Sequence, residues 1–387
     1  MNDNIAVFTR YENRYVLIHT VNNRAMHIYV YNDLSGDGIG SVINCRIEKK
    51  MDGMGSSFVR FAPSRSGFIN KEIKGDTLIP LMLKKEAYND KKAQFTDKIS
   101  IDGQYIVAIL GGSGVKVSSK IPEDKKNHII EVFNKEIKKH HVGVIVRTKA
   151  YTDNDGLNKA KEEFDAIIDI FKDIKNRSEH VPQYTVMYSP LPAYIKDVLY
   201  LCDLGIEEIV TDDDEIFGSL SADHFDIIGP VNVTDRVGLR KYKHELINLC
   251  NLYSFNAKIS EALSEKVYLK SGAYISFGIT EALCAIDVNS SGAARRSDKE
   301  ETVLAINLEA AEEIARQLVL RNISGIIIID FISMRDPESV RLLEDKLKSL
   351  TYNDRTNCRF VDFTGLQLAE IVRTRSGRSL YSMLKGK

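Results

Sequence analysis

Two aspartates that follow apolar runs near the C-terminus are the residues of this chain that point most directly to chemistry. Asp287 follows Ala285-Ile286, and Asp330 follows four consecutive isoleucines. A continuous Val/Ile run predicts a strand that is buried on both faces. An ionised carboxylate in such a place is costly unless a partner such as a metal ion neutralises it. The two aspartates are therefore candidates to share one divalent cation.

The segment between the aspartates predicts how they are brought together. Residues 301–321 are rich in Ala, Leu and Glu, with apolar residues at three- and four-residue steps, which indicates an amphipathic helix. Ser297-Asp298-Lys299-Glu300 has the spacing of a capping box at its start. In such a strand–helix–strand unit, the C-terminal ends of the two parallel strands lie side by side. We therefore expect Asp287 and Asp330 to be neighbours at one edge of a sheet.

These aspartates also have a purely structural explanation. A lone aspartate at the end of a strand more often forms an Asx turn or caps a helix than binds a metal. The pairing of two aspartates across one such unit, with Asn289 beside the first, makes a metal site a candidate, and most of the preference for it comes from a resemblance to a known family. Hard oxygen ligands favour Mg²⁺ over Zn²⁺, and we interpret the nearby Cys284 as a strand-packing residue.

These residues carry a resemblance to a known family. Residues 281–334, which include Asp287-Val288-Asn289-Ser290 and the run from Asn307 to Ala311, resemble the catalytic core of the ribonuclease E/G family. The resemblance implies that Asp287 and Asp330 bind one catalytic Mg²⁺, with no zinc, and that Asn289 orients the scissile phosphate. It implies an endoribonuclease that cleaves single-stranded RNA during RNA processing and decay, leaving a 5′-phosphate and a 3′-hydroxyl.

The resemblance also implies an α/β multidomain fold. In the family, an RNase H-like sheet carries an inserted S1-type OB barrel and a 5′-sensor-like α/β subdomain, and a DNase I-like catalytic subdomain follows. Residues 4–32 show β-type runs with a hairpin signal at Asn22-Asn23, and residues 182–216 are expected to complete their sheet. The expected parts are RNase H-like 1–36 and 178–270, barrel 37–95, sensor-like 96–177 and catalytic 271–387.

The barrel is predicted from a series of short strands and glycine-containing turns in residues 37–71. OB barrels hold single strands by stacking bases on aromatic side chains that lie beside basic ones. Taken alone, Phe58 and Phe68 fit the core of a small barrel. The resemblance instead implies that they contact RNA bases, with Arg60 and Arg65 as added positive charge.

A possible phosphate site follows the strand predicted at residues 142–146. There Arg147 precedes Thr148, and a guanidinium can bind two phosphate oxygens at once. The resemblance implies that Arg147 and Thr148 sense the 5′-monophosphate of RNA. Ser119 and Lys120 stand where the family has two adjacent arginines, so we expect weaker or less strict sensing.

Charge and composition narrow the class of protein. The 387 residues have a formal net charge of −1, so RNA binding must rest on local patches. The basic C-terminal stretch contains Arg373 and Arg375, which the resemblance implies neutralise backbone phosphates. Asn357 replaces a basic residue of the family, and Arg359 is the candidate substitute. The acidic run at residues 212–214 is interpreted as a loop and helix cap.

Expectations about location and assembly come from what the sequence lacks. Its five cysteines are scattered, without metal-ligand spacing, which suits a reducing cytoplasm. We see no signal peptide, and no apolar run approaches the ~20 residues that span a membrane. The zinc-linking Cys-x-x-Cys of the family is not found before Lys387, so we expect a monomer, or a dimer without a zinc link.

Two other functions remain open from sequence. One is a non-catalytic or weakly catalytic RNA-binding protein that acts on ribosomal or regulatory RNA, which the substituted basic positions suggest. The other is a metal-dependent phosphoesterase for small substrates, which would prefer mononucleotides over RNA.

Overall fold

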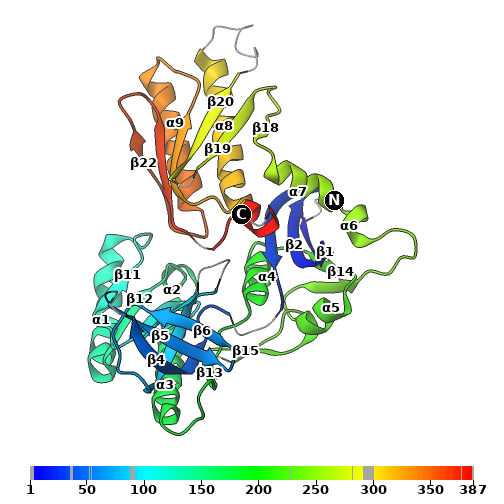
Figure 1. The fold of residues 1–387 in the computed structure, drawn as a ribbon. Helices are drawn as coiled ribbons and strands as arrows, with labels where there is room; N and C mark the ends of the chain where they lie inside the picture. The colour runs from blue at the N-terminus through cyan, green and yellow to red at the C-terminus, as the bar shows by residue number, and fades with distance from the viewer. Residues whose placement is uncertain are drawn as a thin grey trace. The chain divides into compact units, whose positions relative to one another are not determined.

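The structure is a computed structural model of the chain. It describes residues 4–34, 38–51, 53, 55–87, 92–227, 229–280, 282–290, 300–375 and 377–385. The chain divides into two compact units, each assembled from separate segments. Unit 1 contains residues 1–33, 197–221 and 234–387, and unit 2 contains residues 34–196 and 222–233. Both units mix helices and strands (Figure 1), so the α/β class is confirmed.

The first sheet of unit 1 has the strand order β17-β14-β1-β2-β3. Two tight hairpins join β1 to β2 and β2 to β3. Their turn residues, Glu12-Asn13 and Asn22-Asn23, all have positive φ. That backbone matches the twist of two-residue hairpins, and the hairpin predicted at Asn22-Asn23 is confirmed by the pairing of Val21 with Arg24. The strands are β1 (Asn4–Tyr11), β2 (Arg14–Val21), β3 (Arg24–Tyr31), β14 (Glu208–Thr211) and β17 (Gly238–Lys241).

Residues 182–216 were expected to complete this sheet, and only part of the segment does so. β14 pairs in parallel with β1, as expected. β13 (Val186–Tyr188) instead pairs with β4 (Val42–Met51) of unit 2, so that part of the prediction was wrong. The reason is tertiary: buried Asn44 donates to the carbonyls of Ser178 and Val181, at 3.3 and 3.1 Å, and ties the segment to β4.

Short helices accompany the first sheet. They are α4 (Ala193–Asp203), α5 (Asp214–Ser221), α6 (Leu249–Leu252) and α7 (Phe255–Leu263). The acidic run before α5 acts as a helix cap, because Asp213 Oδ1 accepts the backbone N–H of Ile216 at 2.9 Å. The other oxygen of Asp213 pairs with Arg10 Nε at 2.6 Å. The interpretation of this run as a loop and cap is confirmed.

The second sheet of unit 1 contains both candidate aspartates and has the order β18-β19-β20-β21-β23-β22. β20 and β21 are parallel and are joined by the long helix α8, which confirms the strand–helix–strand unit. α8 and α9 pack against one face of this sheet and form its core (Figure 1). Of the predicted capping box, residues 297–299 lie outside the described residues. The elements are β18 (Lys266–Tyr268), β19 (Tyr274–Ile279), β20 (Leu283–Asn289), α8 (Glu300–Leu320), β21 (Gly325–Asp330), α9 (Pro337–Tyr352), β22 (Cys358–Phe363), β23 (Ala369–Arg373) and α10 (Leu380–Lys385).

Unit 2 contains a closed five-strand barrel, which is consistent with the predicted OB-like domain. Its strands run β4-β5-β6-β8-β7, and β4 closes the barrel by pairing with both β5 and β7. A Cβ at Gly67 would collide with the carbonyl oxygen of Ala93, so this close strand contact requires glycine. The remaining strands are β5 (Ser56–Ala62), β6 (Arg65–Ile69), β7 (Leu78–Lys85) and β8 (Ala93–Thr96).

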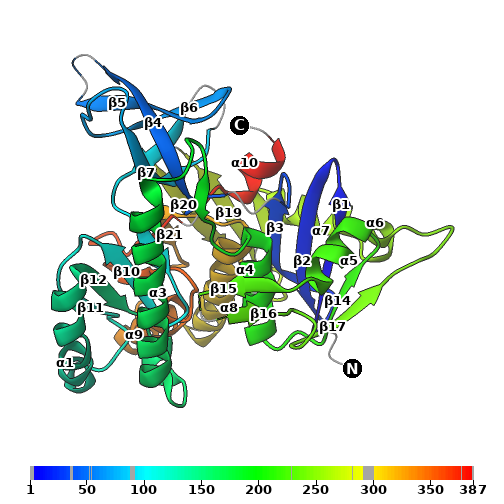
Figure 2. The ribbon, with the colours of Figure 1, turned by 90° about the horizontal axis from the view of Figure 1, so that it is seen from below.

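The other sheet of unit 2 has the order β11-β12-β10-β9, with α1 and α3 beside it (Figure 2). The buried carboxylate of Glu163 in α3 accepts the backbone N–H groups of Gln104, Tyr105 and Ile106 at 2.6, 2.9 and 2.8 Å. Burial raises the pKa of Glu163, and these three donors oppose the rise. The elements are β9 (Ser100–Asp102), β10 (Ile106–Leu110), β11 (Val115–Val117), α1 (Glu123–His140), β12 (Val142–Val146), α2 (Lys149–Thr152) and α3 (Gly156–Ser178), followed by the separate hairpin β15 (His224–Asp226) and β16 (Gly229–Val231).

Two general features complete the fold. In the described part of the chain, no helix is both long and apolar enough to cross a membrane. All five cysteines carry free thiols. Cys284 is 2% exposed and belongs to the core of the second sheet, where burial raises its pKa to about 11. Its interpretation as a packing residue is confirmed.

Candidate functional site

Asp287 and Asp330 are direct neighbours across two parallel strands. They are register partners in the β20–β21 ladder, and each lies at or near the C-terminal end of its strand. Both side chains are on the face of the sheet that the helices leave open. The structure therefore brings together the two carboxylates that the sequence singled out, at the strand ends where α/β sheets bind ligands.

The expectation of burial on both faces of these strands was wrong. Along β20, exposed and buried residues alternate, and the buried set includes Ile286 and Val288. In β21, Ile327 and Ile329 enter the core, whereas Ile326 is 51% exposed. Because side chains alternate between faces at every residue, a run of isoleucines does not by itself mean two-sided burial. Asp287 and Asp330 do not need a metal to offset burial, and their chemistry depends on their proximity to each other.

Asn289 lies on the same face as Asp287, two residues further along β20. Its Nδ2 donates to Asp287 Oδ2 at 2.5 Å. This hydrogen bond orients one carboxylate oxygen and leaves the second N–H of the amide available to another acceptor. The side chain is half-buried, so the amide is held in place while remaining reachable from the open face.

A buried asparagine, named from sequence only as part of the family resemblance and without a role, holds the segment after Asp330. Asn307 of α8 is fully buried, its Nδ2 donates to Ile332 O at 2.8 Å, and its Oδ1 accepts from Ile332 N at 3.1 Å. Glu300 at the start of α8 adds two contacts, accepting the N–H groups of Arg335 and Asp336 at 2.6 and 3.0 Å. The available signal was a lone amide within the apolar face of a predicted helix, which has to find a partner once it is buried.

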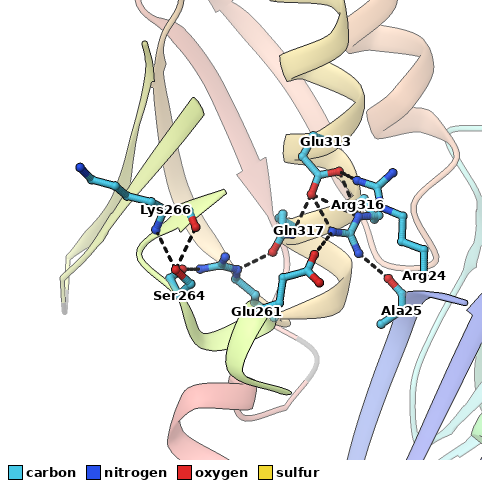
Figure 3. Close-up of polar contacts among 9 residues, drawn as sticks. Arg24, Ala25, Glu261, Ser264, Lys266, Glu313, Arg316 and Gln317 are labelled. Atoms are coloured by element: carbon cyan, nitrogen blue, oxygen red, sulfur yellow. Dashed lines mark hydrogen bonds and ion pairs between the residues drawn. The ribbon is translucent and has the colours of Figure 1, made fainter. Parts of the chain in front are cut away.

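A buried ion network fixes α8 itself (Figure 3). Arg316 and Glu313, both nearly inaccessible to solvent, pair at 2.6 Å between Nη2 and Oε1. Glu313 also pairs with Arg24 at the start of β3, and Arg316 donates to the carbonyl of Ala25. Burial alone raises the pKa of Glu313, but hydrogen bonds from Arg316 and Gln317 outweigh it, so the net shift is downward. The helix between the two aspartates is thereby anchored to the first sheet of unit 1.

The donor set fits a magnesium ion. Two exposed carboxylates offer hard oxygen atoms, and Mg²⁺ in proteins is commonly held by one or two carboxylates with water in its other positions. Within the described ranges, no group of three or more His, Cys, Asp or Glu side chains is placed to hold a metal. The two carboxylates of Asp287 and Asp330 suit a partly hydrated ion.

Phe58 and Phe68 lie on the outer face of the barrel and not in its core. They are directly opposite each other in the β5–β6 ladder, and both are half-buried. Two cations flank them: Lys49 Nζ is 5.9 Å and Lys92 Nζ 4.7 Å from the centroid of the Phe58 ring. The barrel core is formed by other residues, including Val59, Phe61, Ile69, Leu81 and Phe95. An aromatic pair with adjacent lysines on an accessible face is an arrangement that can stack bases.

The two arginines expected to support this face are engaged elsewhere. Arg60 pairs with Glu48 at 2.5 Å and donates to the carbonyl of Pro63 at 3.2 Å. The Arg65 guanidinium lies 4.9 Å from the centroid of the Phe61 ring. The positive charge beside Phe58 comes from Lys49 and Lys92, which the sequence reasoning did not single out.

Arg147 and Thr148 occupy the turn between β12 and α2. The Thr148 hydroxyl is 2.9 Å from the Ser118 hydroxyl, which follows β11. Arg147 is exposed, and its Nη2 lies 3.6 Å from Asp102 Oδ1, so part of its charge is offset. Its backbone N–H donates to Tyr105 O at 2.8 Å, which links the turn to the segment held by Glu163. The pair is thus placed on a well-anchored turn, with the Arg147 side chain exposed and the Thr148 hydroxyl beside that of Ser118.

Arg373 and Arg375 have opposite environments although they are two residues apart. Arg373 is 4% exposed, and its Nε bonds to Asp354 Oδ2 at 2.7 Å. Its Nη1 also donates to Asn322 Oδ1 at 3.0 Å and to Ile323 O at 2.9 Å. The expectation that Arg373 neutralises RNA phosphates was wrong, because its guanidinium is hydrogen-bonded to acceptors inside the protein. Arg375 is exposed, with no ion pair to any other described residue.

Comparison with known proteins adds an independent observation. The sequence model of the Ribonuclease E/G family matches residues 100–376. "Ribonuclease E" of Synechocystis sp. is 30% identical over 338 residues, covering 82% of this chain and 47% of the relative. "Ribonuclease E" of Nostoc sp. is 29% identical, covering 89% and 52%. "Ribonuclease G" of Haemophilus influenzae is 25% identical, covering 96% and 79%.

The chain spans about half the length of the first two of these relatives. The matched region nevertheless contains the whole second sheet of unit 1, from β18 to β23, with the paired aspartates, Asn289 and α8. The geometry of that region and the extent of the match lead to one conclusion: this chain belongs to the ribonuclease E/G family.

Proposed function

We propose that this protein is an endoribonuclease that cleaves single-stranded RNA during RNA processing. The observation that carries the proposal is the side-by-side placement of Asp287 and Asp330 on an accessible sheet face. This pair lies inside the region that matches the family. We propose cleavage by water, leaving a 5′-phosphate and a 3′-hydroxyl.

Each polar residue of the site has a proposed task. Asp287 and Asp330 hold one Mg²⁺, which when bound supplies the positive charge that activates water and offsets charge on the scissile phosphate. Asn289 keeps Asp287 in one orientation through the 2.5 Å hydrogen bond and offers its other N–H to a phosphate oxygen. Asn307 holds the backbone just after Asp330 and acts as a positioning residue.

The RNA-binding part of the proposal rests on the barrel. Phe58 and Phe68 stack bases, and Lys49 and Lys92 contact the neighbouring phosphates. Arg147 and Thr148 recognise a 5′-phosphate, with Ser118 as an additional hydroxyl. Arg375 remains a candidate for backbone phosphate contact.

The finer description of the molecule is proposed on the same family basis. It comprises the RNase H-like, S1-type, sensor-like and DNase I-like parts at the boundaries expected from sequence, except that the segment of β13, expected in the RNase H-like part, pairs with β4 of unit 2. A cytoplasmic location is proposed from the five free thiols.

The experiment that tests the function is cleavage of a labelled single-stranded RNA with a 5′-monophosphate, with Mg²⁺ or with EDTA. Wild type should make internal cuts only with Mg²⁺, and Asp330→Asn should make none while keeping its circular dichroism spectrum. RNA binding without cleavage would favour the non-catalytic RNA-binding function. Preference for a mononucleotide phosphodiester would favour a small-substrate phosphoesterase. A 5′-triphosphate RNA, compared in wild type and Arg147→Ala, tests the sensing role.

A further inference from the structure

A second group of side chains shares the open face of the sheet that carries the two aspartates. Tyr268 and Lys266 of β18 and Tyr274 of β19, which we call the tyrosine platform, all point to that face. The antiparallel ladder puts Tyr274 directly opposite Asn289. Directly opposite residues have Cβ atoms about 4.5–5.5 Å apart. The platform therefore begins at the residue next to the proposed phosphate-orienting asparagine.

The register continues the same row outward from the site. Tyr268 is opposite Tyr274, and Lys266 is opposite Ser276, which is itself opposite Asp287. The two rings have centroids 6.0 Å apart with planes tilted by 52°. Lys266 Nζ lies 4.9 Å from the centroid of the Tyr274 ring. An aromatic pair and a cation thus extend sideways from the carboxylates on one continuous surface.

Core packing does not account for these side chains. Tyr268 is 73% exposed, and Lys266 is exposed as well. Lys266 forms no ion pair with a carboxylate among the described residues. The core beneath is made by Val267 and Ile275, which face the opposite way. An exposed ring next to a half-buried one, with a cation beside them, is suited to contacts with an external π-system and an anion.

The platform is also held rigidly. Glu309 of α8 accepts the backbone N–H groups of Lys270 and Ser271, at 2.7 and 3.3 Å, and pins the β18–β19 turn. The Ser264 hydroxyl accepts from Lys266 N at 3.2 Å and donates to Lys266 O at 2.9 Å. In Figure 3 the Lys266 side chain points away from the buried ion network of Glu313 and Arg316. A preorganised surface loses less conformational entropy when a ligand binds.

We propose that the tyrosine platform stacks a base of the RNA strand immediately beside the scissile phosphodiester, with Lys266 at an adjacent backbone phosphate. This inference rests on the proposed ribonuclease function. Nucleic acid is the occupant that fits, because it presents an aromatic face and a negative charge together and reaches the platform from the neighbouring site. The platform adds a nucleotide subsite on the catalytic sheet itself, separate from the barrel aromatics.

The test is a thermodynamic cycle between protein variants and RNA that lacks one base. The sites cut by wild type are mapped first. RNAs with a single abasic nucleotide at each position around one cut are then titrated in EDTA, using fluorescence anisotropy. The variants are Tyr268→Leu with Tyr274→Leu, which removes both rings but keeps apolar bulk, and Tyr274→Phe, which keeps the ring. Tyr381→Leu, a 46% exposed tyrosine on α10, is the matched control.

The double leucine variant should bind intact RNA about 5- to 150-fold more weakly, the effect of losing one stacked base. Tyr274→Phe and Tyr381→Leu should bind like wild type. The loss should disappear with RNA that is abasic at one position next to the cut, and persist with the other abasic RNAs. Lys266→Gln should reduce the slope of log affinity against log salt by about 0.7, the value for one phosphate on a single strand.

Equal affinity of the double variant and wild type, at unchanged melting temperature, would overturn the platform and leave the ribonuclease function intact. An undiminished loss with every abasic RNA would overturn it too, because no base would then be involved. Failure of wild type to cleave any RNA would overturn the proposed function, and this inference with it.

Discussion

The contrast between Arg373 and Arg375 provides the most discriminating prediction. In Arg373→Met the aliphatic stem is kept, but Asp354 loses its partner inside unit 1. The side chains of this ion pair are only 3% and 6% exposed. Removing one member of a buried pair costs about 3–5 kcal/mol, because the other charge stays buried and unpaired. The carbonyl of Ile323 and the amide of Asn322 also lose a donor.

Urea unfolding followed by circular dichroism measures the loss, with Arg375→Met as the matched variant. Arg375 is exposed, so its replacement should change the free energy of unfolding by no more than about 0.5 kcal/mol. RNA affinity, measured below the unfolding transition at several salt concentrations, should give the reverse ranking. Arg375→Met should lower the salt slope by about 0.7, and Arg373→Met should leave it unchanged. A stable Arg373→Met protein with a reduced slope would refute the assignment of Arg373 to an internal ion pair.

The same ion pair gives a dependence on pH. Burial by itself raises the pKa of Asp354, but the hydrogen bonds and charge of Arg373 and the contacts of Thr356 outweigh it, so the net shift is downward. A carboxyl whose pKa is lowered by folding stabilises the protein above its ordinary pKa of about 3.9, and this stability is lost as pH falls through the lowered value. The coupling between Arg373→Met and Asp354→Asn in a double-mutant cycle should therefore be full at pH 7 and decline below about pH 4. A coupling that grows on acidification would contradict this sign.

Three further perturbations follow from the contacts. Asn307→Leu leaves the N–H and carbonyl of Ile332 without partners, so unfolding free energy should fall by about 2–6 kcal/mol and kcat should fall more than KM rises. Unchanged kcat in a folded variant would remove its positioning role. Glu163→Ala strips an acceptor from three backbone N–H groups, and hydrogen exchange should accelerate at residues 104–106 while the second sheet of unit 1 stays protected. Phe58→Leu should weaken RNA binding about 5- to 150-fold with little change in stability, whereas Phe61→Leu, in the barrel core, should destabilise the protein and leave the affinity of the folded fraction unchanged.

Several of the expectations that the structure confirmed were local in origin. The Asn22-Asn23 hairpin, the helix cap at Asp213 and the amphipathic helix between the two aspartates each depend on neighbours within a few residues. The adjacency of Asp287 and Asp330 followed from one strand–helix–strand unit. Consecutive parallel strands joined by a right-handed crossover helix are usually neighbours in the sheet.

The errors came from interactions between residues far apart in the chain. β13 joined the barrel through the buried amide of Asn44, which no strand pattern reveals. The isoleucine run before Asp330 gave no sign that helices cover only one face of its sheet. Arg373 and Arg375 look alike in the sequence, and the position of Asp354, nineteen residues from Arg373, separates a buried ion pair from an exposed side chain.

The sequence by itself determined which residue types are available for chemistry and which local elements carry them. It specified two carboxylates, an adjacent amide, an aromatic pair in a barrel and an arginine–threonine turn. The tertiary structure alone decided which of these side chains face solvent, which are consumed by internal partners, and that Tyr268, Tyr274 and Lys266 extend the open face beside Asn289. The physical reason is that exposure and partnership depend on strand register and on helix packing between segments far apart in the sequence. Those are properties of the assembled sheet and not of any one stretch of the chain.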